Sequence, residues 1–411
     1  MKRLIAVMLA LALLLTACAQ GNADDLMQNV PAKAVDVLPD MDSGAAAAAA
    51  FGVRLFQASV EEGKNTLISP LSVLYALAMT ANGADDNTLA QMEQVLGMET
   101  EELNSFMRAY LDLLPESKVY KLSLANSIWF KDDPRFQVEQ SFLQTNADYY
   151  GADAYKAAFD EATRNDINNW VKEHTDGMIP EILDEIPEDA VMYLVNALAF
   201  DAEWQEIYEA HQVWEGEFCL EDGTPRTVDL MHSEENRYLE DELATGFIKY
   251  YKDKQYAFAA LLPNEGVTVQ EYVDNLTGEH LMKLLSNPEK VTVFATMPKF
   301  ETEYSVEMSD ALMVMGMTDA FDYRISDFSR LGTYDADGLN ICINRVLHKT
   351  FISVSEKGTR AGAATAVEMV AEGALLIEDY KTVTLDRPFV YMLIDCQTNL
   401  PFFIGTMMDV G

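Results

Sequence analysis

Basic residues are scarce in this chain. Its 411 residues include 29 Lys and Arg against 67 Asp and Glu, which gives a formal net charge of −38 at pH 7. A surface of this sign repels the phosphates of nucleic acid, so we exclude nucleic acid as a partner. The hydrophobic fraction of 49% is sufficient for a large core, and solubility in an extracytoplasmic setting explains the acidity.

Cysteine is also rare, with four residues at Cys18, Cys219, Cys342 and Cys396. No two of them have the spacing of a metal-binding or redox pair, and they do not indicate a disulfide framework. Cys342 and Cys396 lie in apolar segments typical of strands. We therefore predict that these two thiols are buried and unreactive.

Sequence motifs of enzymes are missing as well. The chain has no nucleophile elbow, no Ser-x-x-Lys, no phosphate-binding glycine loop, and no helical zinc pair among its five histidines. Residues 335–338 (DADG) resemble the start of a calcium loop, but Asn344 stands where that motif needs Glu, so we predict a hairpin turn. We expect no catalytic residues, metal or cofactor. An enzyme with catalytic groups far apart in the sequence is the weaker alternative.

The longest purely apolar run at the N-terminus, residues 4–15, is shorter than the ~20 residues that cross a bilayer. It follows Lys2 and Arg3 and ends in the sequence LTAC at 15–18, which resembles a bacterial lipobox. We predict a lipoprotein signal peptide over residues 1–17 and a diacylglycerol on Cys18. The protein would then be extracytoplasmic and lipid-anchored to a bacterial membrane or cell surface. An ordinary signal peptide cut elsewhere is the alternative.

Beyond this leader, residues 18–48 are polar, then Ala-rich, and predict a flexible tether, followed by one domain over 49–411. Helical periodicity starts near Ala49, and Ser69-Pro70 begins a second apolar helix. A further helix is expected at 164–173. Strands are expected later in the chain, at 122–130, 191–200, 256–262, 291–297 and 341–354. The 191–200 run is almost continuously apolar, which predicts a strand buried on both faces. Helices followed mostly by strands indicate an α+β fold.

Small residues dominate the segment 354–369, where a surface loop would normally be polar. With the two-residue period of a strand, one face carries small or apolar side chains and the other carries both charges, Arg360 and Glu368. The first face consists of Thr359, Ala361, Ala363, Thr365, Val367 and Met369. The segment is therefore able to become a buried strand. Alone, it is equally compatible with an Ala-rich helix or a linker.

Two motifs in the correct order carry a resemblance to a known family. Residues 356–359 (EKGT) and the small residues after them resemble the hinge of the reactive loop in serpins, and residues 383–393 (VTLDRPFVYML) resemble the serpin signature. The resemblance implies a serpin fold, in which helices pack on a large central sheet accompanied by two smaller sheets and an exposed reactive loop. It also implies a monomeric inhibitor that traps a serine or cysteine protease by loop insertion. The alternative is a non-inhibitory serpin with a binding or chaperone-like role.

The same resemblance assigns three groups of residues. The hinge corresponds to Glu356, Gly358, Thr359, Ala361, Ala363 and Thr365. The shutter, a polar cluster beneath the opening point of the main sheet, corresponds to Ser69, Ser72, Asn196 and His348. The breach at the top of that sheet corresponds to Trp204, Lys299 and Glu356.

The position of the scissile bond is less well defined. Counting from Glu356 places it between Glu372 and Gly373, whereas counting back from Pro388 places it near Ile377. We favour the first count, because inserted length controls how far a trapped protease is moved. Bonds after Ala371, Leu375 or Leu376 are alternatives. No Lys or Arg lies between 368 and 379, so elastase-like, chymotrypsin-like or Glu-specific targets are expected rather than trypsin-like ones.

Overall fold

The computed structural model describes residues 23–114, 119–187, 190–335, 338–359 and 379–411. The α-helices of this part are α2 (Met41–Ser59), α3 (Pro70–Ala81), α4 (Asp86–Leu96), α5 (Thr100–Leu113), α6 (Gln140–Tyr150), α7 (Glu161–His174), α8 (Val269–Asn275), α9 (Gly278–Ser286) and α10 (Ser309–Met315). The predicted helices at 70–78 and 164–173 are confirmed. Ser69 caps α3 as expected, by accepting a hydrogen bond from the Ser72 N–H, and Pro70 is its first residue.

Three sheets make up most of the β-structure. Sheet A has the strand order β1 (Asp24–Asp25), β5 (Asp153–Ala157), β3 (Tyr120–Lys131), β6 (Met192–Glu203), β16 (Gly358–Thr359), β15 (Arg345–Ser355) and β13 (Phe300–Glu307). Sheet B has the order β2 (Thr66–Ile68), β19 (Pro401–Met407), β18 (Phe389–Asp395), β11 (Tyr256–Pro263), β10 (Ala244–Tyr250) and β9 (Tyr238–Glu240). Sheet C has the order β17 (Tyr380–Thr384), β12 (Thr292–Pro298), β8 (Pro225–Glu235) and β7 (Val213–Cys219), and a separate ribbon pairs β14 (Gly332–Tyr334) with β4 (Phe136–Val138).

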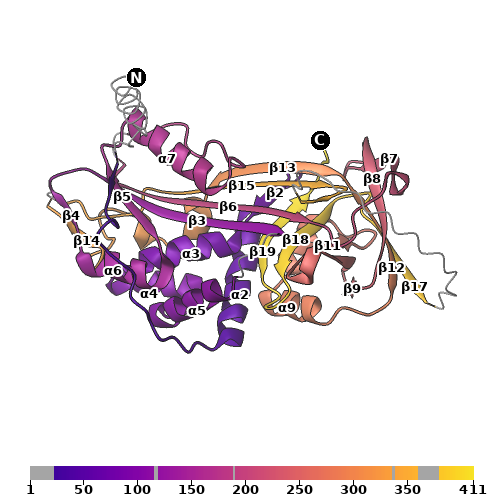
Figure 1. Cartoon of the computed structure of the whole chain (residues 1–411), viewed down its shortest axis with the longest axis horizontal. Helices are drawn as coiled ribbons and strands as arrows, with labels where there is room; N and C mark the ends of the chain where they lie inside the picture. Colours follow the sequence, from indigo (N-terminus) through magenta and orange to yellow (C-terminus); the bar gives the residue numbers. More distant parts are fainter. Residues whose placement is uncertain (1–22, 115–118, 188–189, 336–337, 360–378) are drawn as a thin grey trace, which may run out of the picture.

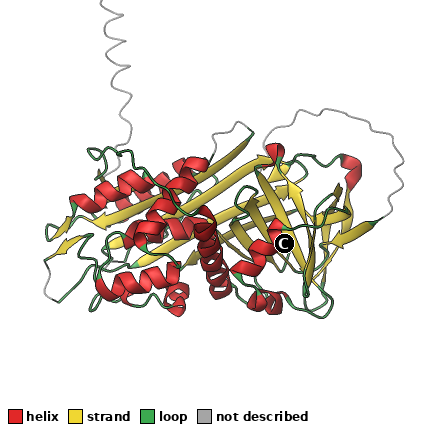
Figure 2. Cartoon of the chain, turned by 90° about the horizontal axis from the view of Figure 1, so that it is seen from below, coloured by secondary structure: helices red, strands yellow, loops and turns green. Residues whose placement is uncertain are grey.

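The long strands of sheet A span much of the molecule (Figure 1). Helices α3 to α6 lie on one side of this sheet and α7 on the other, while sheets B and C gather at the opposite end from β4 and β14. Seen from below, several helices lie in front of the long strands (Figure 2). The α+β class and the expected large sheet with two smaller ones are thus confirmed.

Strand β6 confirms the prediction of a strand buried on both faces. Its even-numbered residues Leu194 and Leu198 join the main core with α3, and its odd-numbered residues Tyr193 and Val195 join a second core beneath α7. Both faces are therefore removed from water, which explains why the strand has no polar alternation. The one amide within this run, Asn196, is fully buried and needs hydrogen-bond partners.

The contact between β6 and β15 changes along its length. The two strands pair directly and in parallel from Arg345 opposite Tyr193 to Thr350 opposite Leu198. Beyond this point β16 lies between them, antiparallel to both, with Thr359 opposite Ala202 and opposite Val354. We call this β6–β15 contact the seam. It is closed at one end and already holds an inserted two-residue strand at the other.

The N-terminal boundary differs from the predicted one. Helix α2 begins at Met41 rather than near Ala49, with Asp40 as its cap, and β1 pairs with β5. The prediction of a flexible tether over 18–48 is therefore wrong for residues 23–48, which belong to the folded domain. The Ala-rich part of this segment packs in the core, where Ala45 and Ala48 are buried. A Cβ at Gly44 would clash with Phe106 of α5. Cys18 and the predicted signal peptide lie outside the described residues. Within the described ranges, no helix has both the length and the apolar character needed to cross a membrane.

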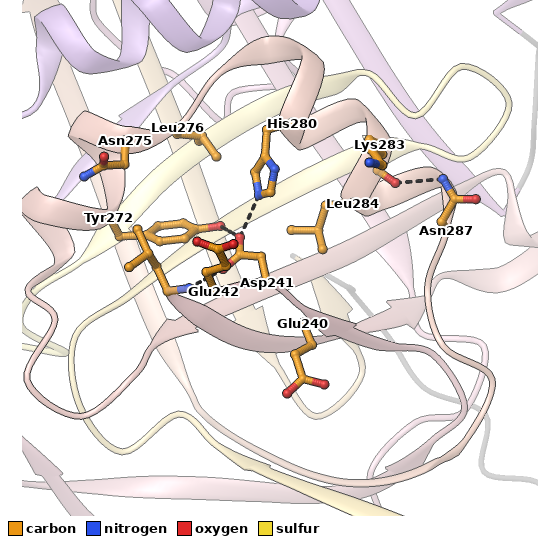
Figure 3. Close-up of a pocket in the computed structure, with 11 residues that line it drawn as sticks. Glu240, Asp241, Glu242, Tyr272, Asn275, Leu276, His280, Lys283, Leu284 and Asn287 are labelled. Atoms are coloured by element: carbon orange, nitrogen blue, oxygen red, sulfur yellow. Dashed lines mark hydrogen bonds and ion pairs between the residues drawn. The ribbon is translucent and has the colours of Figure 1, made fainter.

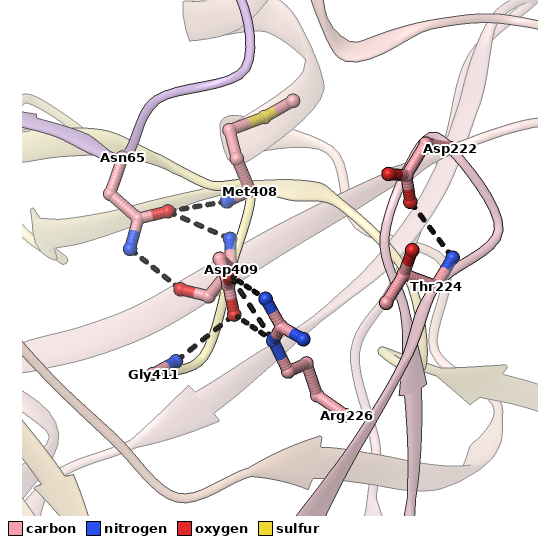
Figure 4. A network of polar contacts seen from close by, with 7 residues as sticks. All are labelled: Asn65, Asp222, Thr224, Arg226, Met408, Asp409 and Gly411. Carbon is pink, nitrogen blue, oxygen red and sulfur yellow. Dashed lines mark hydrogen bonds and ion pairs between the residues drawn. The ribbon is translucent and has the colours of Figure 1, made fainter.

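The C-terminus is fixed by a compact polar network (Figure 4). Asn65 Oδ1 accepts hydrogen bonds from the backbone N–H groups of Met408 (2.6 Å) and Asp409 (3.0 Å), and its amide donates to the Asp409 carbonyl (2.6 Å). The Asp409 carboxylate pairs with Arg226 of β8 at 3.1 Å. This network holds residues 408–411 against β2 and sheet C. It follows directly after β19, which lies with β18 in the middle of sheet B.

Candidate functional site

The closed end of the seam contains a buried polar cluster, which includes the predicted shutter residues. His348 of β15 stands opposite Asn196 of β6, and its Nε2 accepts a hydrogen bond from the Ser69 backbone N–H at 3.0 Å. Its other ring nitrogen, Nδ1, lies 2.7 Å from Asn196 Oδ1. Because Nε2 is an acceptor, Nδ1 carries the hydrogen and donates it to the amide oxygen. The cluster therefore links α3 to both strands of the seam.

Asn196 extends the cluster to a third strand. Its amide nitrogen donates to Asn126 Oδ1 of β3 at 2.6 Å and to the Ser72 carbonyl. Asn126 is not among the residues predicted from the sequence. The signal for it was a polar side chain within the apolar 122–130 strand, because such a side chain needs a hydrogen-bond partner. Ser72 joins through its backbone only, since its buried hydroxyl has no hydrogen-bond partner among the described residues.

The shutter cluster is uncharged. His348 is completely enclosed, and burial lowers its pKa to about 3, since the charged imidazolium would lose its hydration. Ser69, Asn196 and Asn126 are also buried and carry no charge. The closed part of the seam is thus joined by neutral hydrogen bonds at neutral pH.

The open end of the seam is organised by an ion pair. Lys299 lies between β12 and β13, where its ammonium group contacts the Glu356 carboxylate and lies 3.0 Å from Asp229 Oδ2. Partial burial disfavours both charges. The hydrogen bonds and opposite charges around the pair together outweigh this effect, so the pKa of Lys299 is raised and that of Glu356 is lowered. Lys299 and Glu356 are therefore both charged near neutral pH, and the predicted breach pair is formed.

Trp204 holds the turn that leads into β16. Its indole N–H donates to the Ser355 carbonyl at 2.8 Å, and its backbone N–H donates to the Lys357 carbonyl at 2.9 Å. The Tyr208 N–H donates to the Glu356 carbonyl at 2.9 Å. Three successive carbonyl groups of the hinge are therefore bound by one short segment after β6.

An aromatic stack continues from this turn to Thr359, the last described hinge residue. The Trp204 ring stacks on Tyr251 with 4.4 Å between ring centres, and the Tyr251 hydroxyl is hydrogen-bonded to Thr359 Oγ1. Thr359 is 1% exposed. Gly358 has φ of +154°, and a Cβ there would lie 2.0 Å from the Ala202 carbonyl oxygen, so only glycine fits between the strands.

Lys249 is a further breach residue that the sequence did not reveal. Its ammonium group lies 2.7 Å from Glu235 Oε1, and its side chain is only 2% exposed. It is 4.4 Å from the ring centre of Tyr208 and 5.5 Å from that of Trp204, within the range of cation–π attraction. A lysine inside the apolar strand β10 was the only sequence signal. Lys249 supports the two residues that bind the hinge carbonyls.

The structure therefore covers part of the predicted hinge and leaves part untested. Glu356, Gly358 and Thr359 are described and lie together at the open end of the seam. The remaining hinge residues Ala361, Ala363 and Thr365, and the predicted scissile pair Glu372 and Gly373, lie outside the described residues.

A separate pocket of about 610 Å³ lies beside α8, α9 and β9 (Figure 3). Asp241 is its most buried acid, and it accepts hydrogen bonds from the Tyr272 hydroxyl (3.0 Å), His280 Nε2 (2.9 Å) and the backbone N–H groups of Leu243 and Ala244. Burial raises the pKa of Asp241, but these bonds outweigh that effect and lower it overall. This carboxylate therefore fixes the turn at residues 241–244 and links it to α8 and α9.

Other reactive groups in the described chain give no alternative site. None of Cys219, Cys342 and Cys396 forms a disulfide, and no three His, Cys, Asp or Glu side chains of the described ranges are placed to hold a metal ion. Cys342 is buried as predicted. Cys396 is only partly buried and follows β18 in a turn, where desolvation raises its pKa to about 12, so it is a poor nucleophile.

Comparisons with known proteins agree with this geometry. The family model described as "Serpin (serine protease inhibitor)" matches residues 46–410. An uncharacterized serpin-like protein of Thermococcus kodakarensis is 29% identical, and the match covers 95% of this chain and 91% of that protein. The leukocyte elastase inhibitor of Bos taurus is 30% identical, and the match covers 89% of this chain and 99% of that protein. The thermophilic serpin tengpin is 47% identical. Its native state covers 94% of this chain and 100% of its own with a TM-score of 0.90, and its latent state covers 92% and 100% with a TM-score of 0.79.

Proposed function

The chain belongs to the serpin family, and from this premise we propose that it inhibits a serine or cysteine protease as a suicide substrate. Serpins are not enzymes, so the chemistry belongs to the trapped protease and no cofactor is required. The observation that carries the proposal is β16, which occupies the gap between β6 and β15 with the first two residues of a strand. The greater similarity to the native than to the latent tengpin supports a molecule whose insertion has begun and not been completed.

In the proposed reaction the protease hydroxyl or thiol adds to the scissile carbonyl. The peptide bond breaks, the loop nitrogen leaves protonated as a new amino terminus, and an ester or thioester links the protease to the loop. The freed hinge then extends β16 along the seam and separates β6 from β15. This extension exchanges their direct pairing for two new ladders of hydrogen bonds. Movement of the attached protease distorts its active site, and hydrolysis of the acyl-enzyme stalls.

The proposed scissile bond joins Glu372 to Gly373, with bonds after Ala371, Leu375 or Leu376 as alternatives. The absence of Lys and Arg between 368 and 379 supports an elastase-like, chymotrypsin-like or Glu-specific target. The similarity to the leukocyte elastase inhibitor of Bos taurus supports the elastase-like choice. Mixing the protein with one protease of each class and weighing the released C-terminal peptide identifies the bond.

Two loop variants test the inhibitory mechanism itself. Thr365→Arg places a long charged side chain on the face that must enter the sheet, and Ala364→Arg places the same side chain on the opposite face. We expect the wild type and Ala364→Arg to form a complex that survives denaturing electrophoresis. Thr365→Arg should instead be cleaved without trapping the protease. Equal behaviour of the two variants would contradict insertion, and cleavage of the wild type without any complex favours a non-inhibitory serpin.

We also propose that the protein is attached to a bacterial membrane by a lipid on Cys18. The support is the LTAC sequence at 15–18 after a short apolar run. Mass spectrometry of the N-terminal peptide from membrane fractions tests this location. A Cys18→Ala variant should be released from the membrane if the proposal is correct. Retention of that variant in the membrane would overturn it.

A further inference from the structure

The outer face of sheet C carries an unusual group of exposed aromatic side chains. Trp214 of β7 is 51% exposed, Phe294 of β12 is 38% exposed and Tyr380 of β17 is 61% exposed. The strand register places all three on the same face, since Phe294 pairs with Thr382 and Glu234, and Trp214 pairs with Leu230. On the opposite face, Met231, Val293 and Met297 are buried in the core. The three exposed rings therefore lie mostly outside the core.

These rings are held in fixed positions. Trp214 stacks on His232 with 3.4 Å between ring centres and 9° between planes, and His232 Nδ1 is 2.8 Å from Thr296 Oγ1. Phe294 and Tyr380 form an edge-to-face pair at 5.4 Å. Between the two pairs lies an open hollow of about 330 Å³. We call the face made by Trp214, His232, Phe294 and Tyr380 the aromatic face.

The aromatic face also has a charge at its edge. Glu234 is exposed and stands directly opposite Phe294 on the neighbouring strand. No cationic partner of Glu234 is present within the described ranges. An incoming surface that is apolar at its centre and has a Lys or Arg beside it would match this arrangement.

The position of the face relative to the reactive loop decides what covers it. Tyr380 is the first residue of β17, and the candidate scissile bonds follow residues 371 to 376, which lie four to nine positions before Tyr380. Even a fully extended chain of this length reaches only about 15–30 Å. A globular protein of about 200 residues has a radius of gyration of about 16 Å. A protease bound at the loop is therefore kept beside the aromatic face.

We propose that the aromatic face is a second docking site for the target protease, which contacts the rim of the protease's active-site cleft. This inference rests on the proposed inhibitory function and specifies the partner of the same loop. Rigid aromatic side chains are suited to this role, because they bury a large area on binding while losing little conformational freedom. Target choice would then depend on sheet C as well as on the residues around the scissile bond.

The test uses the protease that cleaves the wild type fastest. It compares the rates at which the wild type and its variants associate with that protease. The double variant Trp214→Ser/Phe294→Thr should lower the second-order association rate constant about tenfold, the effect expected for losing central aromatic contacts. Its inhibition stoichiometry and melting temperature should not change. Val314→Ser is the matched control, because Val314 is 82% exposed on α10 and outside sheet C. Glu234→Gln should lower the rate about twofold to threefold and weaken its salt dependence.

The outcomes separate this inference from the proposed function. A double variant within twofold of the wild type would overturn the docking site, whether or not the protein traps the protease. If the wild type is cleaved without being trapped, the same comparison is made on kcat/KM for loop cleavage, and a tenfold loss supports docking even though inhibition has failed. Light scattering provides the last check. A wild-type dimer that the double variant dissociates would assign the face to a second copy of this chain instead.

Discussion

The two ends of the seam between β6 and β15 are held by different kinds of interaction. At the closed end, His348, Asn196 and Asn126 form a buried and neutral hydrogen-bonded cluster. At the open end, charged groups and stacked rings surround β16, with Lys299 paired to Glu356 and Lys249 paired to Glu235. The same two strands are thus joined directly where the cluster is neutral and separated where it is charged.

The difference shows how one sheet can be both closed and able to open. Neutral side-chain amides, hydroxyls and imidazole can exchange partners without leaving a buried charge, so β6 and β15 can separate at moderate cost. The ion pair of Lys299 and Glu356 at the open end holds the hinge turn in the position from which the proposed insertion would start. We expect the buried groups at both ends, Lys249 and the shutter cluster, to control stability, and the surface pair of Lys299 and Glu356 to control timing.

The largest effect is expected at Lys249. Lys249→Met leaves Glu235 without its cation in a largely buried position, which should lower the free energy of unfolding by about 3–5 kcal/mol. Urea unfolding measures this change. The double variant Lys249→Met/Glu235→Leu removes both charges and should recover most of the loss. A single variant as stable as the wild type would show that the charges beneath the breach are not important for stability.

At the closed end, His348→Ala should lower the free energy of unfolding by about 2–3 kcal/mol, because the Ser69 N–H and Asn196 each lose a buried partner. The variant should also form polymers on gentle heating, since β6 and β15 would separate more easily. Thermal unfolding and native electrophoresis measure the two effects. His211→Ala is the control, because this exposed imidazole lies outside the seam. Normal melting and the absence of polymers would exclude the shutter role.

The neutral state of His348 predicts a dependence on pH. Its pKa is about 3 in the folded protein and ~6.5 in the unfolded chain, so the unfolded state takes up a proton first as pH falls. The stabilisation from neutral His348 is complete above about pH 6.5 and is lost progressively toward pH 3. Between pH 7 and pH 5 this one group should account for about 2 kcal/mol.

His348→Gln isolates this contribution, because glutamine can donate to Asn196 and accept from Ser69 without titrating. Its stability should fall less than that of the wild type over the same pH range. Titration of the His348 imidazole near pH 6.5, measured by nuclear magnetic resonance, would contradict the neutral cluster.

The smallest effect on stability is expected for Glu356→Gln. The Lys299 and Glu356 side chains are about a third exposed, and Lys299 keeps Asp229, so the loss should not exceed about 1 kcal/mol. Spontaneous loop insertion should nevertheless become faster, which is measured as loss of inhibitory activity during incubation. Glu303→Gln is the matched control, since Glu303 pairs with Lys349 on the same sheet away from the hinge. Equal rates for the two variants would exclude timing by the breach pair.

Strong local patterns predicted the fold correctly. The apolar run of β6 and the Ser-Pro start of α3 depend on local sequence, so both are readable without tertiary context. The start of α2 was missed because its Ala-rich turns resemble a linker until α5 packs against them. The insertion of β16 could not be predicted either, because it depends on a gap between strands that are distant in the sequence.

Within the candidate site, the residues with a family motif were predicted and the residues around them were not. The structure places His348 beside Asn196 at one end of the seam and Lys299 beside Glu356 at the other. Asn126 and Lys249 were not identified, because their roles arise from partners on other strands. The signal for both was a polar or charged residue in an apolar strand, which shows that a partner is needed but not which one.

The position of β18 and β19 has a consequence for how the molecule is made. These strands are synthesised after both β2 and β11, yet they lie between them in sheet B, and Asn65 binds Met408 and Asp409, which follow β19. Until β18 and β19 have been synthesised, β2 and β11 have no strand between them. The native arrangement therefore cannot be completed step by step from the N-terminus, and sheet B closes only once β18 and β19 are available.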